Sequence, residues 1–134
     1  MEFAYIRDES GFDTGLTCQV SADAGYFPSL VWAYDFATLF SDTLLRADSG
    51  FGLCGVCELP SECWTQVARS AEETEDRIRS TRAIPSDIAM RSSELSRLLK
   101  STGGRRHVIE ALQLTSRWLR EAADRHPALT FYGV

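Results

Sequence analysis

The stretch RRHVIEALQLTSRWLREAADR, residues 105–125, carries apolar side chains at the spacing of one helix face. A period of 3.6 residues aligns six of them into a stripe: Val108, Ala111, Leu112, Thr115, Leu119 and Ala122. Ile109 and Trp118 widen this stripe, as is typical of a helix that is buried along one side. We therefore predict that residues 105–125 form the central helix of the fold.

Three segments before it also have helical spacing. After Pro60, Ser61 can cap a helix that buries Trp64, Val67, Ala68, Ala71 and Ile78. A second helix begins at Ser86, ends at Gly103-Gly104 and buries Ile88, Leu95, Leu98 and Leu99. Residues 30–46 fit a helix as well, but residues 31–34 can instead form a strand, with Asp35 capping a shorter helix.

The remaining apolar runs resemble strands. Residues 3–6 and 16–20 are separated by turn-forming residues, which predicts a loose hairpin. Residues 51–59 suit a buried strand, and residues 129–134 suit a final strand after the helix-stopping Pro127. Strands followed by helices and one returning strand predict an α+β fold: a single domain over residues 1–134, with a small, mostly antiparallel sheet packed by about four helices.

The composition is that of an ordinary soluble protein. The chain has 134 residues, of which 44% are hydrophobic and 25% charged, and this suits one folded domain. The N-terminus lacks the basic start and apolar core of a signal peptide, and no uncharged stretch reaches the roughly 18 residues of a membrane span. We therefore expect a cytoplasmic protein without membrane contact.

Charge is unevenly divided between the two parts of the chain. The first 62 residues carry ten carboxylates against Arg7 and Arg46, a balance of −8. The remainder has a balance of +3, which brings the whole chain to −5. Separated charge of one sign raises the local potential and steers oppositely charged molecules, so this division points to a basic partner for the N-terminal half.

Aromatic residues accompany the acidic ones and could act as anchors within an acidic rim. We predict a partner-binding surface that includes Asp8, Glu9, Asp13, Asp23, Trp32, Asp35 and Asp48. The competing explanation is that many of these aspartates sit in turns, where their side chains form local hydrogen bonds.

The four cysteines raise a second possibility. Cys54 and Cys57 form a C-x-x-C pair, with Cys63 nearby and Cys18 upstream, and zinc and redox sites use pairs with this spacing. In a strand, however, positions 54 and 57 lie on opposite faces, and Glu58-Leu59-Pro60 separates the pair from the next helix. Buried structural thiols are the favoured interpretation, so we predict no metal and no cofactor.

The strongest basic feature is the run from Arg97 to Arg106. Arg97, Lys100, Arg105 and Arg106 surround a Gly pair before a helix N-terminus, an arrangement that could hold an anion. Capping of helix ends by basic residues and glycine explains the same residues without a ligand. His107 and His126 are the only histidines, so the chain offers little material for catalysis by histidine and we predict no enzyme.

In size, acidity and α+β character, the chain resembles bacterial immunity proteins of polymorphic or contact-dependent toxin systems. The resemblance is one of general character, and no residue is carried over from it. It implies an inhibitor that neutralises a basic, nuclease-type toxin, because a nuclease must be cationic to hold phosphate. The alternatives are a protein that binds or processes nucleic acid through residues 97–106, and a zinc-supported regulatory module.

Overall fold

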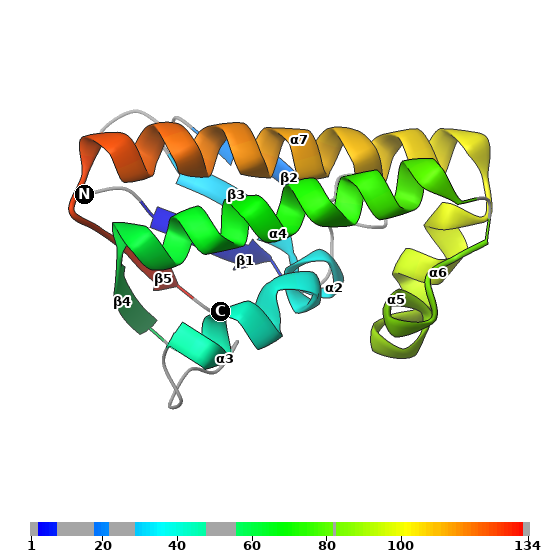
Figure 1. The fold of residues 1–134 in the computed structure, drawn as a ribbon, viewed down its shortest axis with the longest axis horizontal. Helices are drawn as coiled ribbons and strands as arrows, with labels where there is room; N and C mark the ends of the chain where they lie inside the picture. Colours follow the sequence, from blue (N-terminus) through cyan, green and yellow to red (C-terminus); the bar gives the residue numbers. More distant parts are fainter. Residues whose placement is uncertain (1–2, 8–17, 22–28, 48–55, 82, 133–134) are drawn as a thin grey trace.

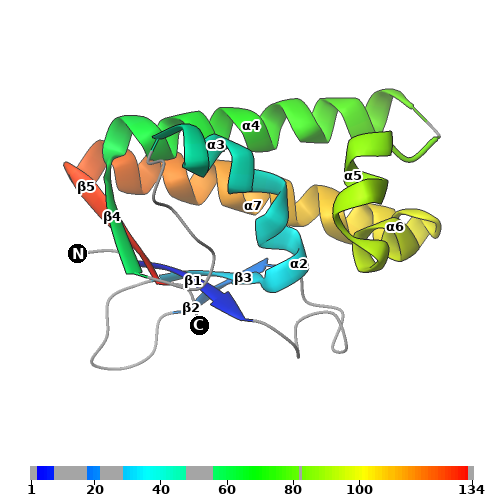
Figure 2. The same cartoon turned by 90° about the horizontal axis from the view of Figure 1, so that it is seen from below.

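The protein is built of a helical layer packed on one face of a β-sheet (Figures 1 and 2). The computed structural model describes residues 3–7, 18–21, 29–47, 56–81 and 83–132. In Figure 2 the helices lie together on the same side of the strands. This arrangement confirms the predicted α+β class.

The sheet has five strands in the order β2-β3-β1-β5-β4. The strands are β1 (Phe3–Arg7), β2 (Cys18–Ser21), β3 (Ser29–Ala33), β4 (Val56–Pro60) and β5 (Ala128–Tyr132). The central strand β1 pairs in parallel with both β3 and β5, whereas the outer strands β2 and β4 pair antiparallel with β3 and β5. The sheet is therefore mixed, and the prediction of a mostly antiparallel sheet is wrong for its centre.

The predicted hairpin between the first two strands is also wrong. β2 pairs with β3, where Cys18 is opposite Trp32 and Ser21 is opposite Ser29. Both long edges of β1 are occupied by β3 and β5, which leaves no edge for β2. Turn-forming residues between two strands show that the chain can reverse there, but they do not fix which strands become neighbours.

Residues 29–47 follow the strand alternative instead of one long helix. β3 ends at Ala33 and is followed by α2 (Tyr34–Ala37), the 3-10 helix η1 (Thr38–Phe40) and α3 (Ser41–Ala47). The strand form is explained by alternation, since Leu30 and Trp32 are fully buried two residues apart. Phe36, Phe40 and Leu44 then continue the buried surface along the helical segment.

Two long helices dominate the other layer: α4 (Ser61–Ser80) and α7 (Thr102–Arg125). They lie side by side in both views. Every residue predicted for the apolar stripe of α4 is buried, as are the six predicted for α7, while Ile109 and Trp118 are partly buried against the core. Trp64 ties α4 to the sheet: its indole N–H lies 3.2 Å from the Leu59 carbonyl and 3.1 Å from that of Leu129.

The connection between the long helices contains α5 (Ser86–Arg91) and α6 (Ser93–Leu99) instead of one continuous helix. Ser92 separates them because its backbone is extended and its hydroxyl accepts the Leu95 N–H at 3.2 Å, capping α6. Of the residues predicted to be buried, Ile88, Leu95 and Leu99 are confirmed, whereas Leu98 is only partly buried against the core.

The Gly103-Gly104 pair does not break a helix, contrary to the prediction. Both glycines lie in the first turn of α7, where the Ser101 hydroxyl accepts the Gly104 N–H at 3.0 Å. A Cβ at Gly104 would overlap the Leu98 carbonyl, whereas one at Gly103 would meet open space. Gly104 is therefore needed for the close approach of α6 to α7, and Ser101 determines where α7 begins.

Candidate functional site

The acidic residues predicted to bind a partner lie largely outside the described part of the chain. This holds for five of them: Asp8, Glu9, Asp13, Asp23 and Asp48. Asp35 lies in α2, two residues after the end of β3. Trp32, the aromatic member of the predicted surface, lies in β3.

Trp32 is a core residue, so its prediction as a partner contact is wrong. Its side chain is fully buried, and its ring centroid lies 4.9 Å from that of Phe40. The indole N–H donates to the Thr115 hydroxyl of α7 at 3.1 Å, which satisfies its polar atom inside the protein. Trp32 therefore joins the sheet to the central helix and offers nothing to an external molecule.

The sheet register nevertheless groups the strand ends to which the acidic segments are joined. Arg7 pairs with Ala33 at the carboxyl ends of β1 and β3, and Val56, the first residue of β4, pairs with Tyr132 of β5. Cys18, which begins β2, is opposite Trp32 near the same end. We call this the carboxyl end of the sheet. In the sequence Asp8 follows Arg7 directly, whereas Asp23 belongs to the connection between Ser21 and Ser29 at the opposite end.

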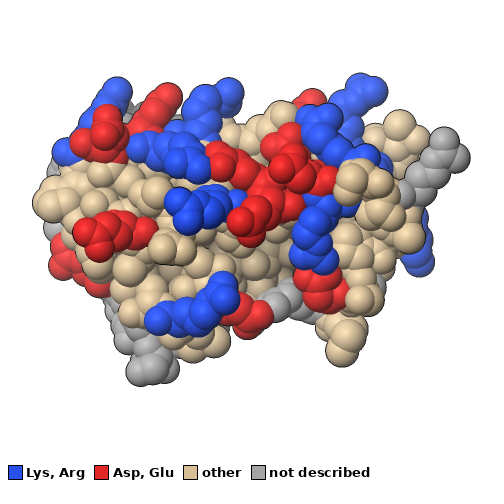
Figure 3. All heavy atoms as spheres, in the orientation of Figure 1, with Lys and Arg blue, Asp and Glu red and all other residues tan. Residues whose placement is uncertain are grey.

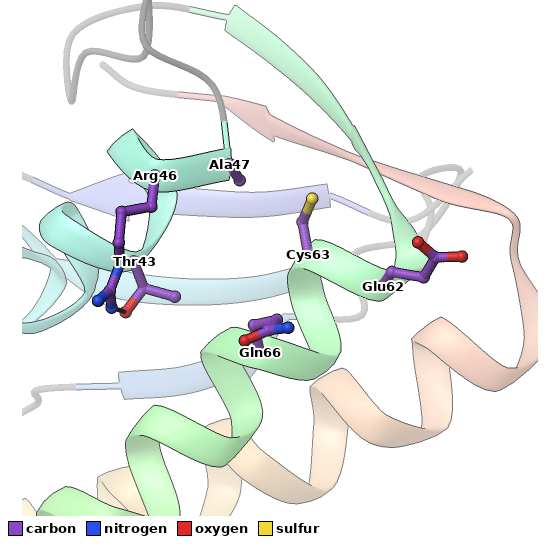
Figure 4. A pocket seen from close by; sticks show the side chains of 6 residues that line it. All are labelled: Thr43, Arg46, Ala47, Glu62, Cys63 and Gln66. Carbon is purple, nitrogen blue, oxygen red and sulfur yellow. Dashed lines mark hydrogen bonds between the residues drawn. The ribbon is translucent and has the colours of Figure 1, made fainter.

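A shallow pocket of about 470 Å³ lies between α3 and the first turns of α4. It is lined by Thr43, Arg46 and Ala47 of α3 and by Glu62, Cys63 and Gln66 of α4. In Figure 4 the Cys63 thiol points toward Ala47, and the Glu62 carboxylate points away from Arg46. Partial burial, and to a lesser degree the negative charge of Glu62, raise the pKa of the Cys63 thiol.

A raised pKa keeps this thiol protonated, and a protonated thiol is a poor nucleophile and a poor metal ligand. Cys18 and Cys57 lie in β2 and β4, opposite Trp32 and Phe131, and Cys54 is outside the described residues. Within the described ranges, no three histidine, cysteine or acidic side chains come together as metal ligands. The geometry of Cys63 thus gives no support to a zinc or redox role for this residue.

The exposed face of α4 and α7 carries charges of both signs in alternation (Figure 3). Glu72 accepts two hydrogen bonds from the Arg120 guanidinium, at 2.6 and 2.8 Å, and a third from the Ser116 hydroxyl at 2.5 Å. These bonds hold the pKa of the Glu72 carboxyl at about 2. Glu75 similarly accepts from Arg79 at 2.7 Å and from Gln113 at 3.1 Å. The helical face is therefore internally neutralised.

The predicted basic run from Arg97 to Arg106 is divided by the structure. Arg97 and Lys100 are exposed near the end of α6, and Arg106 is exposed in α7. Arg105 instead donates to the backbone carbonyls of Ile78 and Thr81 at the end of α4. One end of the Arg105 guanidinium thus caps a neighbouring helix, and its remaining N–H groups are not used by these bonds.

Arg105 and Arg106 also line a pocket that the sequence did not predict. This pocket has a volume of about 330 Å³ and is lined by Arg79, Thr102, Arg105, Arg106, Ile109, Glu110 and Gln113. Arg79 comes from α4, far away in the sequence, and no local pattern connects it with the run after Lys100. We call this site the arginine pocket.

Comparison of the chain with protein-family models, with curated proteins and with solved structures gave no match. A search for an apolar helix of membrane-spanning length likewise found none among the residues that the structure describes.

Proposed function

We propose that this chain is a small acidic inhibitor that binds a basic protein, and specifically an immunity protein that neutralises a nuclease-type toxin in the cytoplasm. The balance of −8 in the first 62 residues is the observation that carries the proposal. A cationic enzyme that grips phosphate is a suitable partner for such a segment, since opposite potentials speed association and select the partner.

The division of charge within the fold supports this proposal. On the described helical face, Glu72 and Glu75 already have arginine partners, so these carboxylates are engaged within the protein. The N-terminal half has Arg7 and Arg46 as its only basic residues. Its ten carboxylates therefore greatly outnumber their local counter-ions, and a basic partner would supply the missing charge.

The topology suggests where such a partner docks. The segments that carry Asp8, Glu9, Asp13 and Asp48 are joined to strands at the carboxyl end of the sheet, and Asp35 follows β3 at that same end. In the sequence Asp23 lies between Ser21 and Ser29, and these two strand residues are at the opposite end of the sheet. We propose that the group at the carboxyl end meets the partner and that Asp23 stays outside the interface.

The first experiment is recovery of the partner from the native host with the tagged protein, followed by a nuclease assay on the purified partner. We expect a basic protein whose nuclease activity is suppressed when this chain is added back. Recovery of nucleic acid in place of a protein would contradict the proposal, and so would a bound protein whose activity this chain leaves unchanged.

The second experiment measures association kinetics of charge variants with that partner. Changing Asp8→Asn, Glu9→Gln and Asp13→Asn together is expected to slow association and to flatten its salt dependence, because rim charges act mainly on the on-rate. The matched control changes Glu73→Gln, Asp76→Asn and Glu121→Gln, three exposed carboxylates of the helical layer. Asp23→Asn is expected to behave like the control. Equal effects of all three sets would refute the proposed docking end.

A further inference from the structure

The arginine pocket lies at the end of the α4–α7 pair that is remote from β4 and β5. α4 begins directly after β4 and α7 ends shortly before β5, so the last turn of α4 and the first turn of α7 form the opposite end (Figure 1). Three guanidinium groups line the pocket there, from Arg79, Arg105 and Arg106, against one carboxylate, that of Glu110. Arg79 is already paired with Glu75, so the positive surplus of the lining comes from Arg105 and Arg106.

Much of the hydrogen-bonding capacity of these arginines is still available. Arg79 uses its Nε atom to reach Glu75, and Arg105 uses one terminal nitrogen for the two carbonyls of α4. Among the described residues, the Arg106 side chain has no hydrogen-bond or ion-pair partner, although Glu110 lies one helical turn away on its own helix. Each guanidinium has five N–H groups, so terminal N–H groups of three arginines remain for a ligand.

From this geometry we propose that the arginine pocket binds the phosphate group of a small phosphate monoester. Guanidinium groups bind phosphate through paired, charge-assisted hydrogen bonds, and a dianion would offset the positive charge of Arg105 and Arg106, which Glu110 balances only in part. The Thr102 hydroxyl and the Gln113 amide add neutral polar groups, and Ile109 supplies an apolar wall. A pocket of about 330 Å³ has room for a small ligand rather than a large one.

The surroundings favour a compact anion over a nucleic-acid strand. Positive and negative side chains are interleaved over the α4–α7 face (Figure 3). The exposed residues of these two helices include the carboxylates of Glu73, Asp76 and Glu121. A long polyanion laid along these helices would meet those carboxylates and gain no continuous basic track. This inference is independent of the inhibitor proposal, because it rests on basic residues of α4 and α7, whereas the inhibitor proposal rests on acidic residues of the N-terminal half.

The test is titration by calorimetry at low salt with ribose 5-phosphate, inorganic phosphate and, as the neutral control, ribose. We expect saturable binding of both phosphates and none of ribose. Arg106→Gln should weaken ribose 5-phosphate binding by about tenfold or more, as expected for loss of charged hydrogen bonds. The affinity of Arg106→Lys for ribose 5-phosphate should fall between those of the wild type and Arg106→Gln, because lysine keeps the charge but cannot form the paired hydrogen bonds of a guanidinium group. Arg105 is left intact because it also caps α4.

Arg125→Gln is the matched control, an exposed arginine in the last turn of the same helix. It should leave phosphate affinity unchanged. The inference is overturned if neither phosphate binds at concentrations up to about 10 mM, well above a millimolar dissociation constant. Equal weakening by Arg125→Gln would overturn it too, since the attraction would then be unspecific. If a short single-stranded oligonucleotide binds more tightly than ribose 5-phosphate and its binding depends on Arg106, the proposed small phosphate monoester is wrong and the ligand is nucleic acid.

Discussion

The middle of the α4–α7 pair and its open end use the same residue types in opposite ways. In the middle, Glu72 meets Arg120 and Ser116, and Glu75 meets Arg79 and Gln113, so charge is cancelled where it stands. At the open end, Arg105 and Arg106 line a pocket together with Glu110 and with Arg79, which Glu75 already pairs, so two arginines face one free carboxylate there. Charges that are paired within the protein stabilise the contact between the helices, whereas unpaired positive charges can attract an anion from solution.

The largest loss of stability should come from substitutions among the buried apolar residues between the helices and the sheet, because surface ion pairs contribute little by comparison. Trp64 is fully buried, donates to two carbonyls and stacks on Phe131. Trp64→Ala should lower the free energy of unfolding by about 3–5 kcal/mol, through loss of burial and creation of a cavity. Denaturant melts measure this. Trp118→Ala, at a partly buried position, should lower the free energy of unfolding by clearly less. A larger loss for Trp118→Ala than for Trp64→Ala would contradict the described burial of these two residues.

The next effect concerns the approach of α6 to α7, which shapes the open end. A side chain at Gly104 would collide with the backbone carbonyl of Leu98, so Gly104→Ala should destabilise the protein by about 1–3 kcal/mol. Gly103→Ala meets open space and should stabilise it by up to about 1 kcal/mol, since alanine is the better helix former. Thermal melts of the pair provide the comparison. Equal behaviour of the two variants would contradict the described helix contact.

A smaller effect separates the two adjacent arginines of the pocket. Arg105→Gln loses the bonds to the Ile78 and Thr81 carbonyls and should lower the free energy of unfolding by about 1–2 kcal/mol. Arg106→Gln should change it by less than about 0.5 kcal/mol, as is usual for an exposed side chain. Chemical denaturation of both variants measures this difference in the free energy of unfolding. A strong loss in the Arg106 variant would assign that residue a structural role.

The smallest effect is the pH dependence of the neutralised face. The folded state holds the pKa of Glu72 at about 2 against an ordinary value of 4.5, so the ionised group stabilises the fold above about pH 4.5. That contribution is lost as the pH falls toward 2. Because the side chain is 42% exposed, Glu72→Gln should lower stability by no more than about 1 kcal/mol at pH 7 and by less near pH 2.

Urea melts across this pH range measure the difference. In an Arg120→Gln background the effect of Glu72→Gln should shrink, because the main cause of the lowered pKa is removed. A difference between wild type and Glu72→Gln that does not vary with pH would show that the ion pair leaves the titration of Glu72 unaltered in solution.

The helices were predictable because their signal is local. The stripes of residues 61–80 and 105–125 repeat every three or four positions, and all of the predicted inward residues lie in the core or against it. Sheet order could not be predicted in the same way. Two parallel pairings bring β1 beside β3 and β5, and nothing within residues 3–7 indicates either neighbour.

The candidate sites were predicted in part for similar reasons. The basic run gave Arg105 and Arg106 of the arginine pocket, but Arg79 enters from another helix and leaves no trace in that run. Trp32 was misjudged because aromatic residues suit interfaces and cores alike, and the partner of its indole, Thr115, lies 83 residues away. Residues 30–33 form an uninterrupted apolar run, so the sequence alone does not single out Trp32 as the buried member.

The parallel pairing of β1 with β5 also has a consequence for how the chain folds. Phe3 is paired with Thr130, so the middle of the sheet joins residues from near both ends of the sequence. Contacts of such long range slow folding, because a large loop must close before they form. The sheet therefore cannot be completed until β5 is in place, and removal of β5 would leave β1 with one partner strand and β4 with none.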